Sequence, residues 1–170
     1  GKCEKTAALW YERAAKQGHV YAQYILGICY ATGTGVGKCA KTAAIWYERA
    51  AKQGDADAQF CLGCCYEDDT GVAKCEKTAA IWYERAAKHG DADAQFNLGV
   101  FYEHGTGVGK CEKTAALWYE RVAKHAGQCQ SAIQPRKLLL VRYWHPPDEG
   151  DFFMKEGLKV MNGGGRKGLK

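Results

Sequence analysis

The apolar positions of residues 5–16, KTAALWYERAAK, follow the period of an amphipathic α-helix. Trp10 and Ala14 fall on one face at helical spacing, whereas Glu12 and the lysines hold the opposite face. Gly18 follows, and glycine is common directly after the last turn of a helix. The pattern therefore predicts a helix that stops before Gly18 and needs a neighbour to cover its apolar face.

Residues 20–36, VYAQYILGICYATGTGV, predict a second helix of different composition. The small residues Ala22 and Gly27 allow a neighbouring helix to approach closely, and Leu26 supplies bulk. Gly33 and Gly35 break the helix. Two helices joined by such short connections are too small to bury their own apolar faces, so each pair needs further pairs stacked on it.

Both patterns recur with a period of 36 residues, from residue 10 to residue 46 and onwards. The period is marked by four tryptophans, Trp10, Trp46, Trp82 and Trp118. It predicts one orphan second helix at 1–18, helix pairs at 19–54, 55–90 and 91–126, and non-repeat residues at 127–170. Because stacked pairs cover one another, we expect an all-α fold, an α/α superhelical solenoid of helix-turn-helix repeats.

Residues 91–124, DADAQFNLGVFYEHGTGVGKCEKTAALWYERVAK, resemble the Sel-one-like repeat family, relatives of the tetratricopeptide repeats. Units of that family are written A-x-x-L-G-x-x-Y-x-x-G-x-G-V followed by A-x-x-W-Y-x-x-A-A, and three full copies match in register over residues 1–125. The resemblance implies a superhelical adaptor that binds proteins or peptides, in bacterial host-contact and signalling systems or in eukaryotic quality control. It implies no catalytic residues and no cofactor.

One position departs from the family pattern, because Asp or Asn is usual there and a side-chain oxygen can cap the helix. This chain has cysteine in all four copies, at Cys3, Cys39, Cys75 and Cys111. A thiol caps a helix poorly, so each replacement is expected to cost about 1 kcal/mol.

The first helix of each pair varies between copies much more than the second. Tetratricopeptide-like solenoids line their concave groove with first helices, so by analogy we expect the variable positions to bind the partner. The candidates are Tyr21, Tyr24, Ile28, Asp57, Phe60, Cys64, Asp93, Phe96, Asn97 and Val100. Among them, Tyr24, Phe60 and Phe96 form an aromatic row, and Asn97 can hold a peptide backbone. Two alternatives stay open: drift at half-exposed sites, and an aromatic row that belongs to the core.

The cysteines predict neither a disulfide nor a metal site. Those that repeat once per unit are separated by the spacing of stacked helix pairs, about 10 Å, which exceeds the reach of a disulfide, about 7 Å between Cα atoms. Cys61, Cys64 and Cys65 form C-x-x-C-C, but a tetrahedral zinc site needs a second ligand pair. We interpret these three as small apolar core residues. The framework of the family's cysteine-rich branch is absent, because its positions hold Ala15, Ala22, Ala51 and Ala58.

Enzymatic activity is not expected. Some family members have been linked with β-lactamase activity or penicillin binding, which is the remote alternative here. Such an enzyme needs an S-x-x-K nucleophile, and the only serine of the chain, Ser131, begins SAIQ. A cysteine nucleophile with a histidine base is neither excluded nor favoured by the spacing.

Charge and hydropathy limit the partners. The chain has 24 Lys and Arg against 19 Asp and Glu, but the excess lies in the last forty-five residues. The repeats themselves mix both signs, which gives little support to a nucleic-acid-binding face with its basic stripe. No apolar run approaches the roughly 20 residues of a membrane span. Because Gly1 lies within a repeat phrase, we expect a fragment of a longer protein. A structural spacer within that protein is the alternative to an adaptor; secreted, periplasmic and cytoplasmic locations all fit.

Residues 127–170 leave the repeat pattern, and two interpretations are open. The segment RKLLLVRYW at 136–144 is apolar enough to cap the open end of the stack. Alternatively, a shift of one nucleotide permits NAKVQSNLGNCYLYGIGI over 128–145, which aligns without gaps to 91–108. We hypothesise that a frameshift replaced a fourth helix pair, and the codons of 134–137 decide this.

Overall fold

The computed structural model describes residues 2–128, and the side chains from 3 to 124. Within this part the chain forms seven α-helices and no strand. They are α1 (Lys2–Lys16), α2 (Val20–Thr32), α3 (Ala40–Lys52), α4 (Ala56–Glu67), α5 (Glu76–Lys88), α6 (Ala92–His104) and α7 (Glu112–Gln128). The predictions for residues 129–170, the capping segment and the shifted frame, lie outside these residues.

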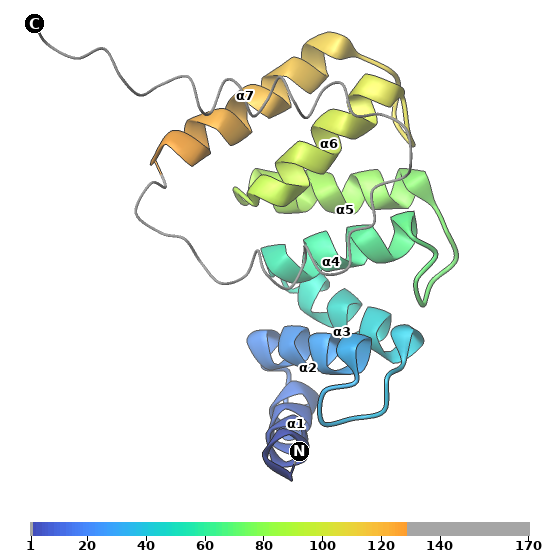
Figure 1. The fold of residues 1–170 in the computed structure, drawn as a ribbon, viewed down its shortest axis with the longest axis vertical. Coiled ribbons are helices and arrows are strands. Elements are labelled where there is room, and N and C mark those ends of the chain that lie inside the picture. The colour runs from blue at the N-terminus through green and yellow to red at the C-terminus, as the bar shows by residue number, and fades with distance from the viewer. Residues whose placement is uncertain (1, 129–170) are drawn as a thin grey trace, which may run out of the picture. The chain divides into compact units, whose positions relative to one another are not determined.

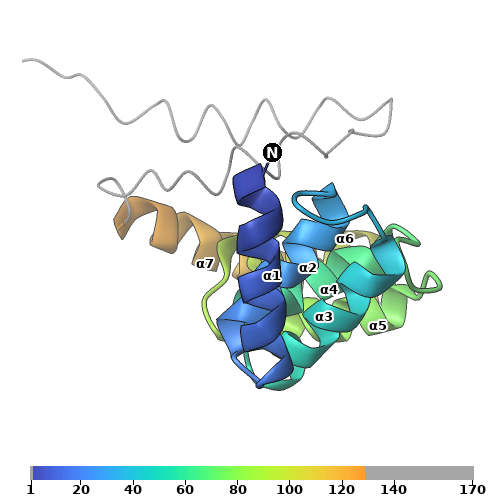
Figure 2. The same ribbon diagram turned by 90° about the horizontal axis from the view of Figure 1, so that it is seen from below.

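Each helix packs against the helices that precede and follow it in the chain (Figures 1 and 2). The pairs α2/α3, α4/α5 and α6/α7 follow one another, and α1 packs on α2 ahead of them. The predicted all-α repeat solenoid is confirmed. None of the described helices is both long and apolar enough to cross a bilayer.

The two helices of a pair meet where a glycine faces a tyrosine ring. A Cβ atom added to Gly63 of α4 would lie 2.6 Å from Cε1 of Tyr83 in α5. The same contact recurs between Gly27 and Tyr47, and between Gly99 and Tyr119. Real Cβ atoms do not approach so closely, so only glycine lets the ring come this close to the backbone of the first helix.

Successive pairs are joined by the loop that follows each first helix. Gly71, in the loop after α4, has φ +79° and lies so close to Ala40 that an added Cβ would be 2.2 Å from its carbonyl oxygen. Gly107, with φ +64°, approaches Glu76 in the same way one repeat later. Each loop therefore lies on the start of the second helix of the preceding pair, and both glycines supply a conformation that other residues avoid.

The core consists mainly of buried alanines, against which a few larger side chains pack. Trp82 of α5 shares an apolar cluster with Tyr47 of α3 and Leu62 of α4, so the tryptophan covers the junction between two repeats. Gln59 is buried there, and its Nε2 donates to the carbonyl oxygen of Ala51 at 3.1 Å. The same bond joins Gln23 to Ala15 and Gln95 to Ala87.

The glycine–tyrosine contact predicts the effect of one methyl group. Gly63→Ala should lower the free energy of unfolding by about 1–3 kcal/mol, because Tyr83 is fully buried and cannot move away. The better helix propensity of alanine, worth about 1 kcal/mol, opposes only part of this cost. Urea denaturation followed by circular dichroism measures the change. Gly37→Ala is the control, because nothing lies within 4 Å of its added Cβ; equal effects at both positions would contradict the contact.

Candidate functional site

The ten candidate positions lie on the first helices α2, α4 and α6. Tyr21 and Phe96 are 54% and 41% exposed, and Asp93 is also exposed. Six candidates are half-buried: Tyr24, Ile28, Asp57, Cys64, Asn97 and Val100. Phe60 differs from all of these, because only 8% of it is exposed.

The aromatic row packs on the tyrosines of the second helices. Tyr24 lies 6.3 Å from Tyr47, Phe60 lies 5.7 Å from Tyr83, and Phe96 lies 5.7 Å from Tyr119, measured between ring centroids. Phe60 also belongs to the apolar cluster between α5 and α6, which explains its burial. The row is therefore an accessible surface at Phe96 and part of the core at Phe60.

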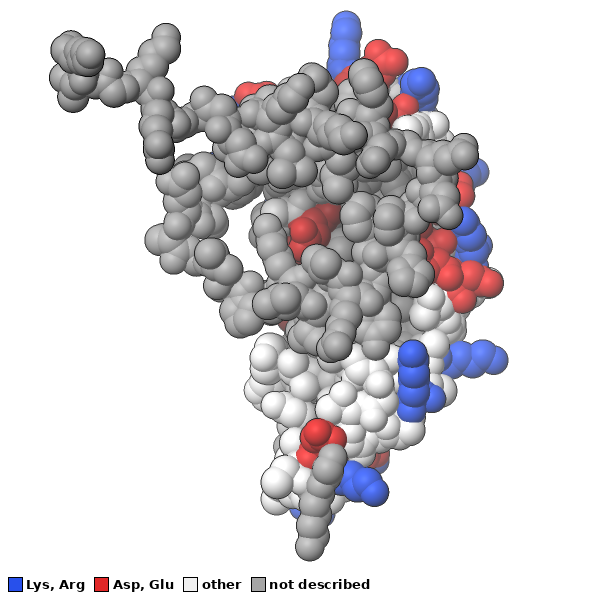
Figure 3. Space-filling view, viewed as in Figure 1, with Lys and Arg blue, Asp and Glu red and all other residues white. Residues whose placement is uncertain are grey.

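Charge is divided between the two kinds of helix. The segments 19–37, 55–73 and 91–109, which contain the first helices, hold no Lys or Arg. They hold eight acidic residues: Asp55, Asp57, Glu67, Asp68, Asp69, Asp91, Asp93 and Glu103. All Lys and Arg of residues 2–128 lie on or just before the second helices. In Figure 3, most of the visible Lys and Arg project from the right-hand edge. The total charge of the chain hides this division, which a count per helix reveals.

Acidic side chains meet near the start of α6. Asp91 caps this helix, and its Oδ1 accepts a hydrogen bond from the backbone N of Ala94 at 2.7 Å. The pKa of Asp91 is raised to about 6: burial is the main cause, the cap bond opposes it, and the charges of Asp93 and Asp57 add to the increase. Since Asp57 lies on α4, carboxylates of two successive repeats share one negative region.

The C-x-x-C-C cysteines of α4 are not activated thiols. Burial raises the pKa of Cys64 to about 12, even though its Sγ accepts a hydrogen bond from the Tyr83 hydroxyl at 3.3 Å. Burial also raises the pKa of Cys61 and Cys65. Among the described residues, no group of three or more His, Cys, Asp or Glu is placed to hold a metal ion.

The cysteines before the second helices have the opposite character. The Sγ atoms of Cys39, Cys75 and Cys111 accept hydrogen bonds from the Thr three residues later, at 3.2, 3.0 and 3.1 Å. This bond is the main cause of the lowered pKa of all three thiols, and the nearby backbone N–H of the same Thr also favours the thiolate. These cysteines are half-exposed, so their thiolates are accessible. The thiols of Cys39 and Cys75 make no cap bond to the backbone.

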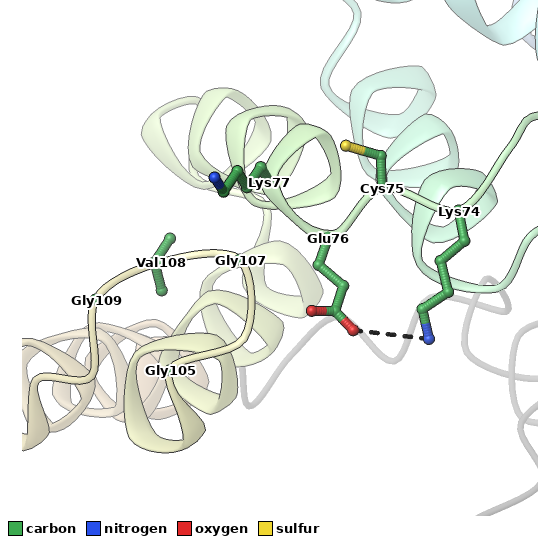
Figure 4. Close-up of a pocket in the computed structure, with 8 residues that line it drawn as sticks. All are labelled: Lys74, Cys75, Glu76, Lys77, Gly105, Gly107, Val108 and Gly109. Carbon is green, nitrogen blue, oxygen red and sulfur yellow. Dashed lines mark ion pairs between the residues drawn. The ribbon is translucent and has the colours of Figure 1, made fainter.

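A shallow cleft of about 570 Å³ adjoins one of these thiols (Figure 4). It lies between the start of α5 and the loop that precedes α7, and is lined by Lys74, Cys75, Glu76, Lys77, Gly105, Gly107, Val108 and Gly109. Glu76 points toward Lys74 and pairs with it at 3.7 Å, whereas the Cys75 thiol points away from that pair. The cleft results from the packing of the Gly107 loop and brings together no catalytic set.

The repeats match the model of one family, described as Sel1 repeat, over residues 4–19, 20–55, 56–91 and 92–126. The chain belongs to the Sel1 repeat family. This confirms the resemblance inferred from the sequence. A comparison with curated proteins gave no match.

Solved structures of Sel1 repeat proteins resemble the chain closely. A Sel1 repeat protein from Oxalobacter formigenes is 40% identical with a TM-score of 0.69, and the match covers 71% of this chain and 50% of that one. The protective antigen c5321 of uropathogenic Escherichia coli, which has an SLR fold, is 36% identical with a TM-score of 0.67. That match covers 68% of this chain and 25% of the antigen. The chain thus spans half or less of the length of these two relatives.

A third structure shares the fold alone. Cysteine rich protein B of Helicobacter pylori is 24% identical with a TM-score of 0.57, over 72% of this chain and 88% of that protein. The eight cysteines within residues 3–111 of the present chain are all free thiols.

The two classes of thiol should differ in reactivity. At pH 7 we expect iodoacetamide to alkylate Cys39, Cys75 and Cys111 at least about tenfold faster than Cys61 and Cys64, because the thiolate is the nucleophile. Peptide mapping by mass spectrometry measures each rate. Thr78→Val should slow the reaction of Cys75 and leave Cys39 unchanged, so Cys39 is an internal control. Equal rates at all these positions would contradict the assignment.

Asp91 should make stability depend on pH. Its pKa is about 6 in the folded chain and 3.8 without the fold, so the free energy of unfolding falls as pH rises from about 4 to 6. An asparagine at this position would keep the cap without the charge. As the pH is raised from 4 to 7, the free energy of unfolding of Asp91→Asn should therefore increase relative to that of wild type by about 1–2 kcal/mol. Urea denaturation at both pH values measures this, and Asp55→Asn, the same change at the same cap of α4, reports the contribution of capping. A difference that does not grow with pH would refute the role of Asp91.

Proposed function

We propose that this chain is a non-catalytic scaffold that binds a protein or peptide along its first helices. Sel1 repeat proteins are in general protein-interaction scaffolds, which supports a protein partner. One observation carries the proposal for the binding surface: at some positions of the first helices where the copies differ, the side chains are accessible. At one position the three copies have Tyr21, Asp57 and Asp93, none of them buried.

The chemistry of this surface favours a partner with cationic and apolar side chains. Phe96 presents an exposed aromatic ring, and Asp93 lies three residues before it on the same face of α6. The segments that form this surface hold no Lys or Arg, so a basic side chain of the partner meets no like charge there. Asn97 is half-buried next to Phe96, and its amide can both donate to and accept from the backbone of an extended peptide.

A structural spacer is the second candidate, and the burial of Phe60 favours it. This aromatic residue fills the core between α5 and α6 instead of a binding surface. In a spacer, the first helices would vary only because nothing selects their exposed side chains.

Serine acylation, as in β-lactamases, has no support. The chain lacks an S-x-x-K sequence, and its only serine is Ser131. Cys64 is the cysteine among the groove candidates, and its pKa of about 12 keeps it protonated at neutral pH.

A peptide array probed with the full chain tests the binding surface. We expect basic peptides with apolar residues to bind, and Phe96→Ala and Asn97→Ala each to weaken the best of them at least tenfold. Phe60→Ala is unsuitable because it opens a cavity in the core. Lys52→Ala, on the second helix α3, is the control and should leave binding unchanged. Absence of binding to every peptide would overturn the proposal in favour of the spacer.

A further inference from the structure

The second helices carry an exposed apolar row that packing does not explain. Its members are Leu9, Ile45, Ile81 and Leu117, which we call the aliphatic ridge. They occupy one position of the repeat, on α1, α3, α5 and α7, and are between 48% and 59% exposed. The tryptophan that follows Ile45 and Ile81 is only 8% exposed, so the ridge is turned away from the core. Leucine and isoleucine exchange along the row, but no copy has a polar residue.

Cations flank each member of the ridge on the same helical face. An exposed lysine lies four residues before it and an exposed arginine four residues after it, as Lys41 and Arg49 do around Ile45. The arginines also lie over the adjacent tryptophan rings, at 4.5 to 4.9 Å from the centroid. The cations are Lys5, Arg13, Lys41, Arg49, Lys77, Arg85, Lys113 and Arg121. None of them forms an ion pair within the described residues.

The acidic residue beside the ridge is neutralised within its own helix. Glu48, three residues after Ile45, pairs with Lys52 at 2.7 Å. The same pair at the same distance occurs on α1, α5 and α7, between Glu12 and Lys16, Glu84 and Lys88, and Glu120 and Lys124. The charge that is left around each ridge residue is therefore positive.

We propose that the aliphatic ridge binds an acidic peptide segment of a partner protein, with apolar side chains of that segment on the ridge and carboxylates between the flanking cations. Charge complementarity selects an acidic partner, because two cations per repeat have no acid of their own. The half-exposed aliphatic side chain between them selects a partner that also has apolar residues. This surface lies on the second helices and is separate from the surface proposed above.

The direction of the helices favours a peptide over a membrane. The axes of α1, α5 and α7 point in clearly different directions (Figures 1 and 2). Helices that point in different directions do not present their exposed faces to one plane, so a flat bilayer would contact only some of them. An extended segment can follow the row from one helix to the next.

Fluorescence anisotropy with the full chain and a labelled peptide of alternating Glu and Leu tests the proposal. We expect binding that weakens with salt and that is at least tenfold weaker in Ile45→Gln/Ile81→Gln and in Lys41→Gln/Lys77→Gln. Ile45→Leu/Ile81→Leu keeps the aliphatic surface and should change the Kd less than twofold. Lys74→Gln/Lys110→Gln removes two charges outside the ridge and should change it less than threefold.

Three outcomes would overturn the proposal. They are no binding of the Glu-Leu peptide, equal binding of a Lys-Leu peptide, and binding of phosphatidylserine vesicles or duplex RNA in its place through the same ridge residues. Phe96→Ala should leave the Glu-Leu peptide bound as before. A failure of the first-helix surface is thereby distinguishable from a failure of the ridge.

Discussion

The contact between a glycine of the first helix and a tyrosine of the second determines the geometry of every helix pair. Because Gly63 has no side chain, the Tyr83 ring lies against the backbone of α4, and its hydroxyl reaches the Glu67 carboxylate. Phe60 packs on the same ring. One close approach thus positions a core aromatic residue, a part-buried hydrogen bond and one member of the aromatic row. The pair α6/α7 repeats it with Gly99, Tyr119 and Glu103.

The sequence predicts this architecture well, since the period carries most of the information. A fixed spacing of tryptophans and glycines leaves little choice but stacked helix pairs, and the helix that was expected to stop before Gly18 ends at Lys16. The exposure of single residues is harder to predict. Phe60 and Phe96 occupy the same position in their repeats, yet only Phe60 is enclosed by a following first helix among the described residues. Periodicity predicts the same environment for both positions. Their actual burial depends on whether another repeat packs over them.

The aliphatic ridge shows that a position with nearly the same residue in every copy can also be exposed. A helix with an unchanging sequence is naturally interpreted as a packing helix, and for Tyr83 and Ala86 that interpretation holds, because both are fully buried. Ile81 belongs to the same unchanging phrase and is half-exposed. Similarity between copies therefore does not separate core from surface, and hydrophobicity alone does not either. Only the three-dimensional arrangement shows that this helix has an apolar face in contact and a second apolar row in solvent.

The division of charge gives a physical reason for the cysteines that start the second helices. A carboxylate would cap these helices better than a thiol. At Cys39, however, it would lie two residues from Lys41, close enough that this lysine already helps to lower the pKa of the thiol. An Asp there would neutralise one of the two cations beside Ile45. The thiol is uncharged when protonated and accepts a hydrogen bond from the Thr42 hydroxyl, so in that form it does not offset the charge of the lysine. Weaker capping and a more basic surface are thus two consequences of the same substitution, repeated along the second helices.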